Sequence, residues 1–179
     1  MSSIKINKKK GIVFWITGLS GSGKTRLGMK IKKKITKIYG PTILFSGDDI
    51  RNIFNLKKYS LNDRKKIVIN YSKLSQNIYN QNINVIFCVV GLMHEVHKMN
   101  RKNIENYVEI FVKAPMNKVE KLSNKTIYKK KYIRQVVGFD IKPEYPKNPT
   151  ITIVNDFSKP IEKLSEILLS KIKKIVKTK

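Results

Sequence analysis

Short apolar segments recur along the chain, and stretches whose apolar residues fall at helical spacing separate them. Five of the apolar segments have the length and composition of strands: residues 12–17, 42–45, 85–90, 107–112 and 150–154. The segment 85–90 is apolar at every position, which indicates a strand buried on both faces. Strands that alternate with helices predict an α/β fold, in which helices cover both faces of a five-stranded parallel sheet.

The clearest helical pattern lies over residues 24–39, where Leu27 and Ile31 share one face and Gly40-Pro41 follows. A helix over about 61–80 has Ser60 in front of it, a residue type that caps helix N-termini well. Further helices are expected near residue 48, from about residue 116 and over 160–176. The last is amphipathic and basic, and we expect it to pack on the sheet rather than lie on a membrane.

The chain has 179 residues and no internal repeat or break in composition. We therefore expect a flexible basic leader over 1–10 and a single domain over 11–179. No apolar run approaches the ~20 residues that span a bilayer, and the polar N-terminus lacks the apolar core of a signal peptide. The single cysteine, Cys88, excludes an intrachain disulfide. These features favour a cytoplasmic protein with no membrane partner.

The net charge of +26 leaves two interpretations open. A field of this size attracts polyanions and speeds the capture of anionic substrates. The excess is nearly all lysine, however, beside abundant isoleucine and asparagine, as the codon bias of an AT-rich genome would produce. Proteins that read nucleic acid use arginine for bidentate base contacts, and arginine is scarce here. We therefore expect no specific nucleic-acid partner.

A phosphate-binding motif joins the first strand to the first helix. Its residues are Gly18, Leu19, Ser20, Gly21, Ser22, Gly23, Lys24 and Thr25, which match G-x-x-x-x-G-K-[ST] between a buried strand and a helix. Glycine lets the backbone wrap a phosphate, and the wrapped N–H groups form an anion site at the helix N-terminus. Lys24 can reach the β- and γ-phosphates, and the Thr25 hydroxyl can coordinate Mg²⁺. The motif predicts a P-loop NTPase fold of three layers that binds ATP.

A carboxylate follows the second predicted strand, at the edge of the sheet where the P-loop lies. Asp48 could accept a proton from an acceptor hydroxyl group and hold Mg²⁺ through water. The alternative is that Asp48 only caps the helix that follows. Asp49 is the weaker candidate for the base. Arg51, about one helical turn further on, would present a planar fork to an anionic acceptor.

Several further strings resemble the adenylylsulfate kinase family, whose members phosphorylate the ribose 3′-hydroxyl of adenosine 5′-phosphosulfate. The opening W-x-T-G-L-S-G-S-G-K-T is present over residues 15–25, and D-G-D-x-[ILV]-R corresponds to Ser46-Gly47-Asp48-Asp49-Ile50-Arg51. The string [FY]-S-x-x-D-R corresponds to 59–64, the lid string K-G-L-Y-K-K to 125–130, and T-G-[IV]-D to 137–140. The likeness extends from the first strand to about Pro149.

The resemblance implies a role for each matching residue. Asp48 would be the base, with Mg²⁺ bound to it through water, and Lys24 would neutralise charge on the transferring group. The acceptor nucleotide would be held by Arg51, Tyr59, Arg64, Val137 and Gly138. Lys129 and Lys130 would close over the phosphate, although a lysine run by itself is usually a solvated surface. The resemblance also implies a small anionic nucleotide as substrate, ATP as co-substrate and a homodimer.

The chain departs from the family on the acceptor side. Ser46 replaces the first aspartate of D-G-D, and Gly91 replaces a serine that is phosphorylated in some members. The second of two aromatic residues that enclose the acceptor adenine corresponds to Val136. The segments 91–104 and 136–140 are similar to a branch of the family found in surface-polysaccharide gene clusters, one type of which phosphorylates cytidine diphosphoramidate. An adenylylsulfate kinase is the first expectation, and a kinase for another nucleotide is the alternative.

A third hypothesis is that the chain is a degenerate P-loop protein that binds nucleotide or nucleic acid without catalysis. It rests on the altered acceptor side and on the charge of +26. His94 and His97 lack the second histidine of the H-E-x-x-H metal motif, so we interpret them as surface or lid residues.

Overall fold

The computed structural model describes residues 4, 6–57, 59–122 and 135–177. Strands and helices alternate along it, as the apolar pattern predicts. The strands are β1 (Val13–Thr17), β2 (Thr42–Ser46), β3 (Asn84–Val89), β4 (Tyr107–Lys113) and β5 (Ile151–Val154). The helices are α1 (Lys24–Tyr39), α2 (Gly47–Ile53), α3 (Leu61–Tyr79), α4 (His94–Asn103), α5 (Met116–Leu122) and α6 (Ile161–Ile175).

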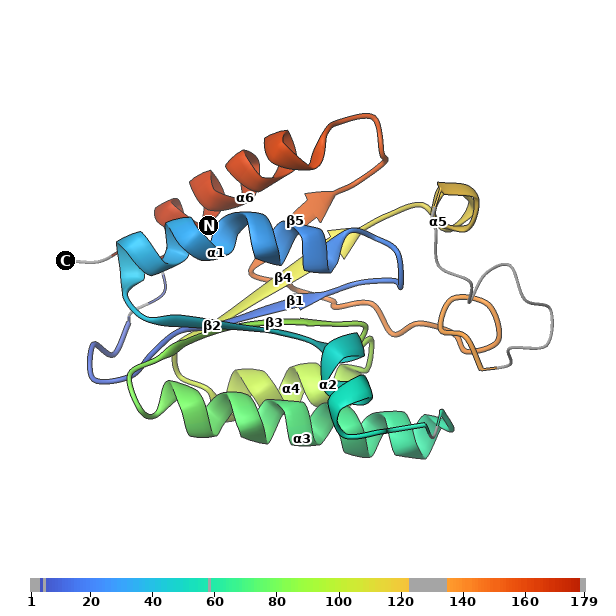
Figure 1. Ribbon diagram of the computed structural model, residues 1–179, viewed down its shortest axis with the longest axis horizontal. Coiled ribbons are helices and arrows are strands. Elements are labelled where there is room, and N and C mark those ends of the chain that lie inside the picture. The colour runs from blue at the N-terminus through green and yellow to red at the C-terminus, as the bar shows by residue number, and fades with distance from the viewer. Residues whose placement is uncertain (1–3, 5, 58, 123–134, 178–179) are drawn as a thin grey trace.

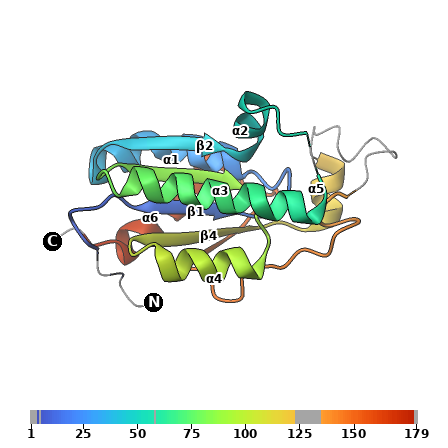
Figure 2. The same cartoon turned by 90° about the horizontal axis from the view of Figure 1, so that it is seen from below.

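The five strands form one parallel sheet in the order β2-β3-β1-β4-β5. Figures 1 and 2 show α1 and α6 on one face of the sheet and α3 and α4 on the other. Side chains alternate along β1: Phe14 and Ile16 join the core under α1 and α6, and Val13 and Trp15 join the core under α3 and α4. A strand covered on both faces must be apolar throughout, which is why the sequence pattern identified these strands.

The predicted helices agree closely with the observed ones. The helix expected over 24–39 has those bounds, and Ser60 caps α3 as predicted, since its hydroxyl oxygen accepts a hydrogen bond from the Asp63 N–H at 3.1 Å. The C-terminal amphipathic helix packs on the sheet, with Leu168 and Ile172 fully buried.

Helix α4 is absent from the sequence prediction because its inward face is partly polar. His97 and Asn100 are buried there, so the apolar spacing that reveals a helix is missing. The interpretation of His97 as a surface or lid residue is wrong, because its side chain is 2% exposed. Among the described residues, no group of three or more His, Cys, Asp or Glu side chains could hold a metal ion.

The segment expected to be a flexible leader makes defined contacts where the structure describes it. Ile4 pairs with Val176, and Ile4 and Ile6 pack against the core. The Asn7 N–H donates to Asn106 Oδ1 at 2.8 Å, and Asn106 Nδ2 donates to the Asn7 carbonyl oxygen at the same distance. The described part of this segment therefore contacts the rest of the chain, whereas the division into a leader and a single domain stays a prediction.

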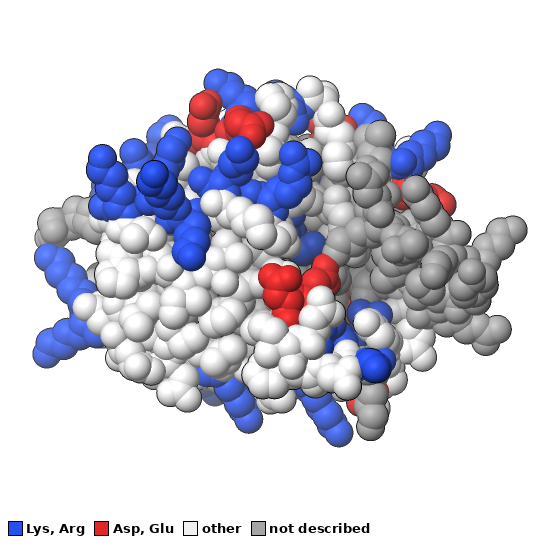
Figure 3. All heavy atoms as spheres, viewed as in Figure 1, with Lys and Arg blue, Asp and Glu red and all other residues white. Residues whose placement is uncertain are grey.

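Basic side chains gather over α1 in Figure 3, and a small acidic group lies beside α2. Helix α1 exposes Lys30, Lys32, Lys33, Lys34 and Lys37, and α2 carries the exposed Asp48 and Asp49. The described helices include none with the length and apolar character needed to cross a membrane.

Candidate active site

The carboxyl ends of the parallel strands meet at one edge of the sheet, on the right in Figure 1. The P-loop follows β1 at this edge, α2 follows β2, and the run 90–93 follows β3. Ligands of open α/β sheets bind at such an edge, because the loops there diverge and leave crevices between them.

The P-loop has the backbone conformation that phosphate binding requires. Gly21 and Gly23 have φ values of 78° and 92°, in the left-handed region that glycine adopts without strain. Lys24 is buried, and its ammonium group donates to the Leu19 carbonyl oxygen at 2.6 Å. The loop leads directly into α1, so its N–H groups lie at a helix N-terminus and favour an anion.

Two residues that the sequence analysis did not select brace the P-loop. Asn155, just after β5, donates from Nδ2 to the Ser22 carbonyl oxygen at 3.0 Å. The Thr17 hydroxyl donates to the Val90 carbonyl oxygen and ties the end of β1 to the end of β3. Nothing local in the sequence marks Asn155, because it meets the loop across 133 residues of chain.

Two cavities open at this edge, and they share a boundary. One, of about 500 Å³, is lined by P-loop residues including Lys24 and Thr25, and it extends to the connection between β5 and α6. The other, of about 540 Å³, is lined by Arg51, Tyr59 and Arg64. Both volumes suit a nucleotide-sized ligand. The residues common to both linings are Ser20, Gly47, Asp48, Val89 and Val90. Asp48 therefore lies where ligands in the two cavities would meet.

Helix α2 presents Asp48, and Ser46 is its N-cap. The Ser46 hydroxyl oxygen accepts from the Asp49 N–H at 3.4 Å. The alternative that Asp48 only caps this helix is therefore wrong, because Asp48 lies within the first turn. Ser46 therefore caps the helix with a neutral side chain. Asp49 lines neither cavity.

Two arginines and a tyrosine form a cationic wall in the larger cavity. The Arg51 and Arg64 guanidinium carbons lie 4.8 and 5.2 Å from the centroid of the Tyr59 ring. Burial, and then the positive charge of Arg51, lower the pKa of the Arg64 guanidinium. Arg64 also donates to the carbonyl oxygens of Tyr59, at 2.9 Å, and Gln135, at 2.7 Å. Two neighbouring guanidinium groups at a cavity wall suit an acceptor with several negative charges.

Another part of the cavity wall is the turn that follows residue 135. Val136 and Val137 are buried and line the cavity, and the Val136 N–H donates to Asp140 Oδ2 at 2.8 Å. Gly138 does not line the cavity. Its φ is 103°, and a Cβ atom at this position would lie 3.0 Å from Leu19 Cδ2, so glycine allows the turn to pack closely against the P-loop. Gly91 is part of the cavity lining as well.

The predicted lid residues Lys129 and Lys130 lie outside the described residues. For the metal, the Thr25 hydroxyl and the Asp48 carboxylate line the same cavity. Mg²⁺ prefers oxygen ligands and usually takes only one or two from the protein, with waters and phosphates completing its shell. These residues therefore fit a magnesium ion.

Comparisons with known proteins indicate the same family over most of the chain. The sequence model of the adenylylsulphate kinase family matches residues 10–154. The cytidine diphosphoramidate kinase of Campylobacter jejuni is 29% identical over 168 residues, which cover 92% of this chain and 98% of that protein. The adenylyl-sulfate kinase of Clostridium acetobutylicum is 31% identical over 154 residues, which cover 83% of this chain and 77% of that protein.

Solved structures agree with the fold. The Mycobacterium tuberculosis APS kinase in complex with AMPPNP and APS superposes with a TM-score of 0.80. It is 23% identical, and the match covers 92% of this chain and 98% of that one. At this identity the likeness supports the fold alone.

Proposed function

Because the chain belongs to the adenylylsulphate kinase family, we propose that it transfers the γ-phosphoryl group of Mg·ATP to a ribose hydroxyl group of a small anionic nucleotide. The family makes the chain a phosphotransferase that uses ATP. The observation that carries the rest of the proposal is the position of Asp48 between the P-loop cavity and the cavity of Arg51 and Arg64.

The P-loop cavity would hold the triphosphate. Its backbone N–H groups would cradle the phosphates, and Lys24 would turn its ammonium group from the Leu19 carbonyl oxygen toward the transferring phosphoryl group. Thr25, with Asp48 through water, would hold Mg²⁺, which supplies charge neutralisation between the phosphates. Positioning and charge neutralisation carry most of the catalysis of phosphoryl transfer.

The larger cavity would hold the acceptor. Arg51 and Arg64 would bind its anionic groups, and Asp48 would accept the proton of the ribose hydroxyl as that oxygen attacks the γ-phosphorus. The bond from the γ-phosphorus to the bridging oxygen then breaks, and ADP leaves. Val137 would contribute an apolar wall, and Gly138 would hold that wall against the P-loop.

Two acceptors are the candidates: adenosine 5′-phosphosulfate and cytidine diphosphoramidate. The first is supported by the family as a whole and by the adenylyl-sulfate kinases among the relatives. The second is supported by the likeness to the Campylobacter jejuni enzyme and by Val136 in the cavity wall. A small apolar side chain gives less stacking surface than an aromatic ring, a loss that suits a smaller base.

The deciding experiment is ADP release from Mg·ATP with each acceptor in turn, with Lys24→Ala as the blank. Turnover with adenosine 5′-phosphosulfate would identify an adenylylsulfate kinase, and turnover only with cytidine diphosphoramidate would identify the alternative. ATP binding without turnover for either acceptor would contradict both assignments and would favour another nucleotide or binding without catalysis. A homodimer remains a prediction that sedimentation of the same protein would test.

A further inference from the structure

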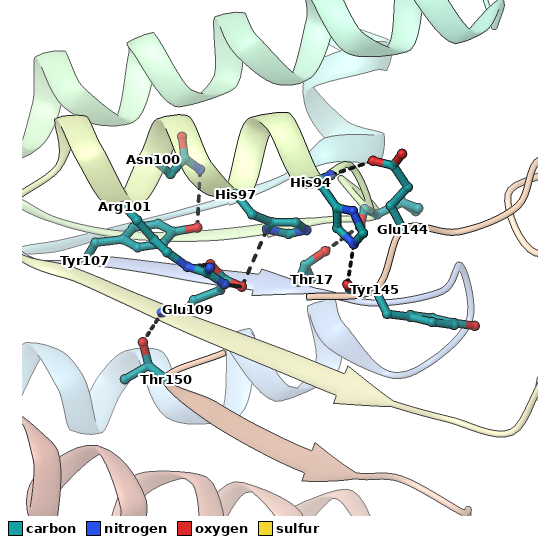
Figure 4. A network of polar contacts seen from close by, with 11 residues as sticks. Thr17, His94, His97, Asn100, Arg101, Tyr107, Glu109, Glu144, Tyr145 and Thr150 are labelled. Carbon is teal, nitrogen blue, oxygen red and sulfur yellow. Dashed lines mark hydrogen bonds and ion pairs between the residues drawn. The ribbon is translucent and has the colours of Figure 1, made fainter. Parts of the chain in front are cut away.

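His94 has no part in the proposed chemistry, yet it joins two distant segments. It is the first residue of α4 and directly follows the run 90–93 at the edge of the sheet. Its backbone N–H donates to Glu144 Oε2 at 2.6 Å, and its ring Nε2 lies 2.9 Å from the Tyr145 carbonyl oxygen (Figure 4). A carbonyl oxygen only accepts hydrogen bonds, so Nε2 carries the proton in this contact.

A third hydrogen bond runs alongside these two. The Glu144 N–H donates to the Leu92 carbonyl oxygen at 3.1 Å. Leu92, Met93 and Glu144 all line the acceptor cavity, and so do Ile141 and Lys142. The contacts of His94 therefore lie directly behind the wall of that cavity, next to the lining residues Met93 and Glu144, and connect two segments that are about 50 residues apart in the chain.

Helix α4 is the fixed side of this connection. Arg101 near its end donates twice to Glu109 on β4, from Nε at 3.0 Å and from Nη2 at 2.8 Å. Asn100 donates from Nδ2 to the Tyr107 hydroxyl at 3.3 Å and accepts from the hydroxyl of Ser72 on α3. Buried polar networks in which the charged groups are paired hold an element in one place.

The segment that His94 contacts, on the other side of this connection, has fewer stabilising contacts of its own. Residues 142–149 form neither helix nor strand. Glu144 is exposed, and the Tyr145 ring, 42% of whose residue surface is exposed, contacts Phe111 with the ring centroids 5.4 Å apart. The attachment to α4 is thus one of the few contacts that hold this part of the cavity wall, beside the bridge from Ile141 to Val137 and the packing of Tyr145 on Phe111.

We propose that His94 is a positioning residue for acceptor binding: its side chain fixes the cavity wall at 141–145 to the N-terminus of α4. The expected effect on acceptor binding rests on the proposed function, whereas the attachment of residues 141–145 to α4 does not. The P-loop cavity has no residue of this wall in its lining, so the effect is confined to the acceptor.

Three variants distinguish the hydrogen bond from His94 to the Tyr145 carbonyl oxygen from a packing effect of the side chain. His94→Ala removes the donor, and His94→Gln places an amide N–H as many bonds from the backbone as Nε2. His94→Asn places the amide one bond closer, out of reach of the Tyr145 carbonyl. Lys98→Ala, on the exposed side of α4, is the matched control.

The test is a steady-state assay in which the concentrations of both substrates are varied. The variants His94→Ala and His94→Asn should raise the KM for the acceptor about fivefold or more, the factor expected for one ordinary hydrogen bond. The KM for ATP and kcat should stay near the wild-type values, and Gln should restore the acceptor KM. An equal rise in both KM values, or a Gln variant that behaves like Ala, would overturn the proposal.

Amide hydrogen exchange at Glu144 provides a readout that needs no acceptor. Its N–H is bonded to Leu92 and should exchange several-fold faster in Ala and Asn than in wild type, Gln and Lys98→Ala. Unchanged exchange would overturn the proposal whatever the substrate. If the wild type turned over no nucleotide, the proposed function would fail, and exchange at Glu144 alone would decide whether His94 positions this wall.

Discussion

At the scale of single residues, the candidate site depends on where Asp48 stands. Adjacent residues at a helix start point in different directions, and here only Asp48, not its neighbour Asp49, lines both cavities. Ser46 is the N-cap of α2, so capping is not the function of Asp48. Two aspartates with the same charge, in the same helix turn, thus differ in their position relative to the cavities.

We expect Asp48→Asn to lower kcat by about 10²–10⁴-fold, the usual contribution of a positioned general base. The amide keeps the size of the side chain, so the circular dichroism spectrum and the thermal midpoint should not change. Asp49→Asn is the control and should retain most of the activity. Near-normal turnover by Asp48→Asn would remove Asp48 from the role of base.

At the scale of elements, polar residues at helix ends decide how the helices meet the site. Ser60 and Asp63 form a reciprocal pair at the start of α3: the Asp63 N–H donates to the Ser60 hydroxyl oxygen, and that hydroxyl donates back to Asp63 Oδ2 at 2.5 Å. Tyr59 and Arg64 flank this pair and line the acceptor cavity. The string that resembles the family motif is therefore in part a helix cap that holds a binding wall.

Ser60→Ala should lower the free energy of unfolding by about 1 kcal/mol, the typical loss for an N-cap. Ser60→Thr keeps a hydroxyl and should lose much less. Urea denaturation followed by circular dichroism would measure both. Equal losses for Ala and Thr would mean that the hydroxyl contacts do not stabilise α3.

At the scale of the whole molecule, the parallel sheet buries charged and polar groups between its layers. Glu109 on β4 is buried beneath α4 with Arg101 as its partner, and His97 Nδ1 lies 3.6 Å from Glu109 Oε1. Burial, and next the electrostatic effects of Arg101 and His94, lower the pKa of His97 to about 4, and Glu144 acts in the opposite direction. Burial raises the pKa of Glu109, and Arg101 opposes this shift.

The His97 shift predicts a loss of stability in acid. Between pH 6.5 and 4 the unfolded chain binds a proton at His97 that the folded protein excludes, so the free energy of unfolding falls as the pH falls. The full shift corresponds to about 3 kcal/mol. Glu109 acts in the opposite direction, because the folded protein binds a proton at Glu109 at a higher pH than the unfolded chain does. The effect of His97 is therefore measured as the difference in the free energy of unfolding between wild type and His97→Gln, from denaturation curves across this pH range. Parallel pH profiles for the two proteins would contradict the prediction.

The sequence by itself determined the order of the elements and the phosphate-binding loop. Strands buried on both faces are apolar at every position, and the P-loop is a contiguous string, so both leave local patterns. The match of α1 to its predicted bounds over 24–39 and the Ser60 cap follow from the same locality.

Only the tertiary structure decided which distant segments contact each other at the carboxyl edge of the sheet. Arg64 meets Gln135 across 71 residues, and Asn155 meets the P-loop across 133. The sequence did not predict helix α4 because two polar residues, His97 and Asn100, are buried on its inner face. The burial of Asn100 depends on partners from other elements, Ser72 and Tyr107. Contacts between distant segments leave no periodic trace in the chain, so the boundary at Asp48 between two cavities could be seen only once the strands lay side by side.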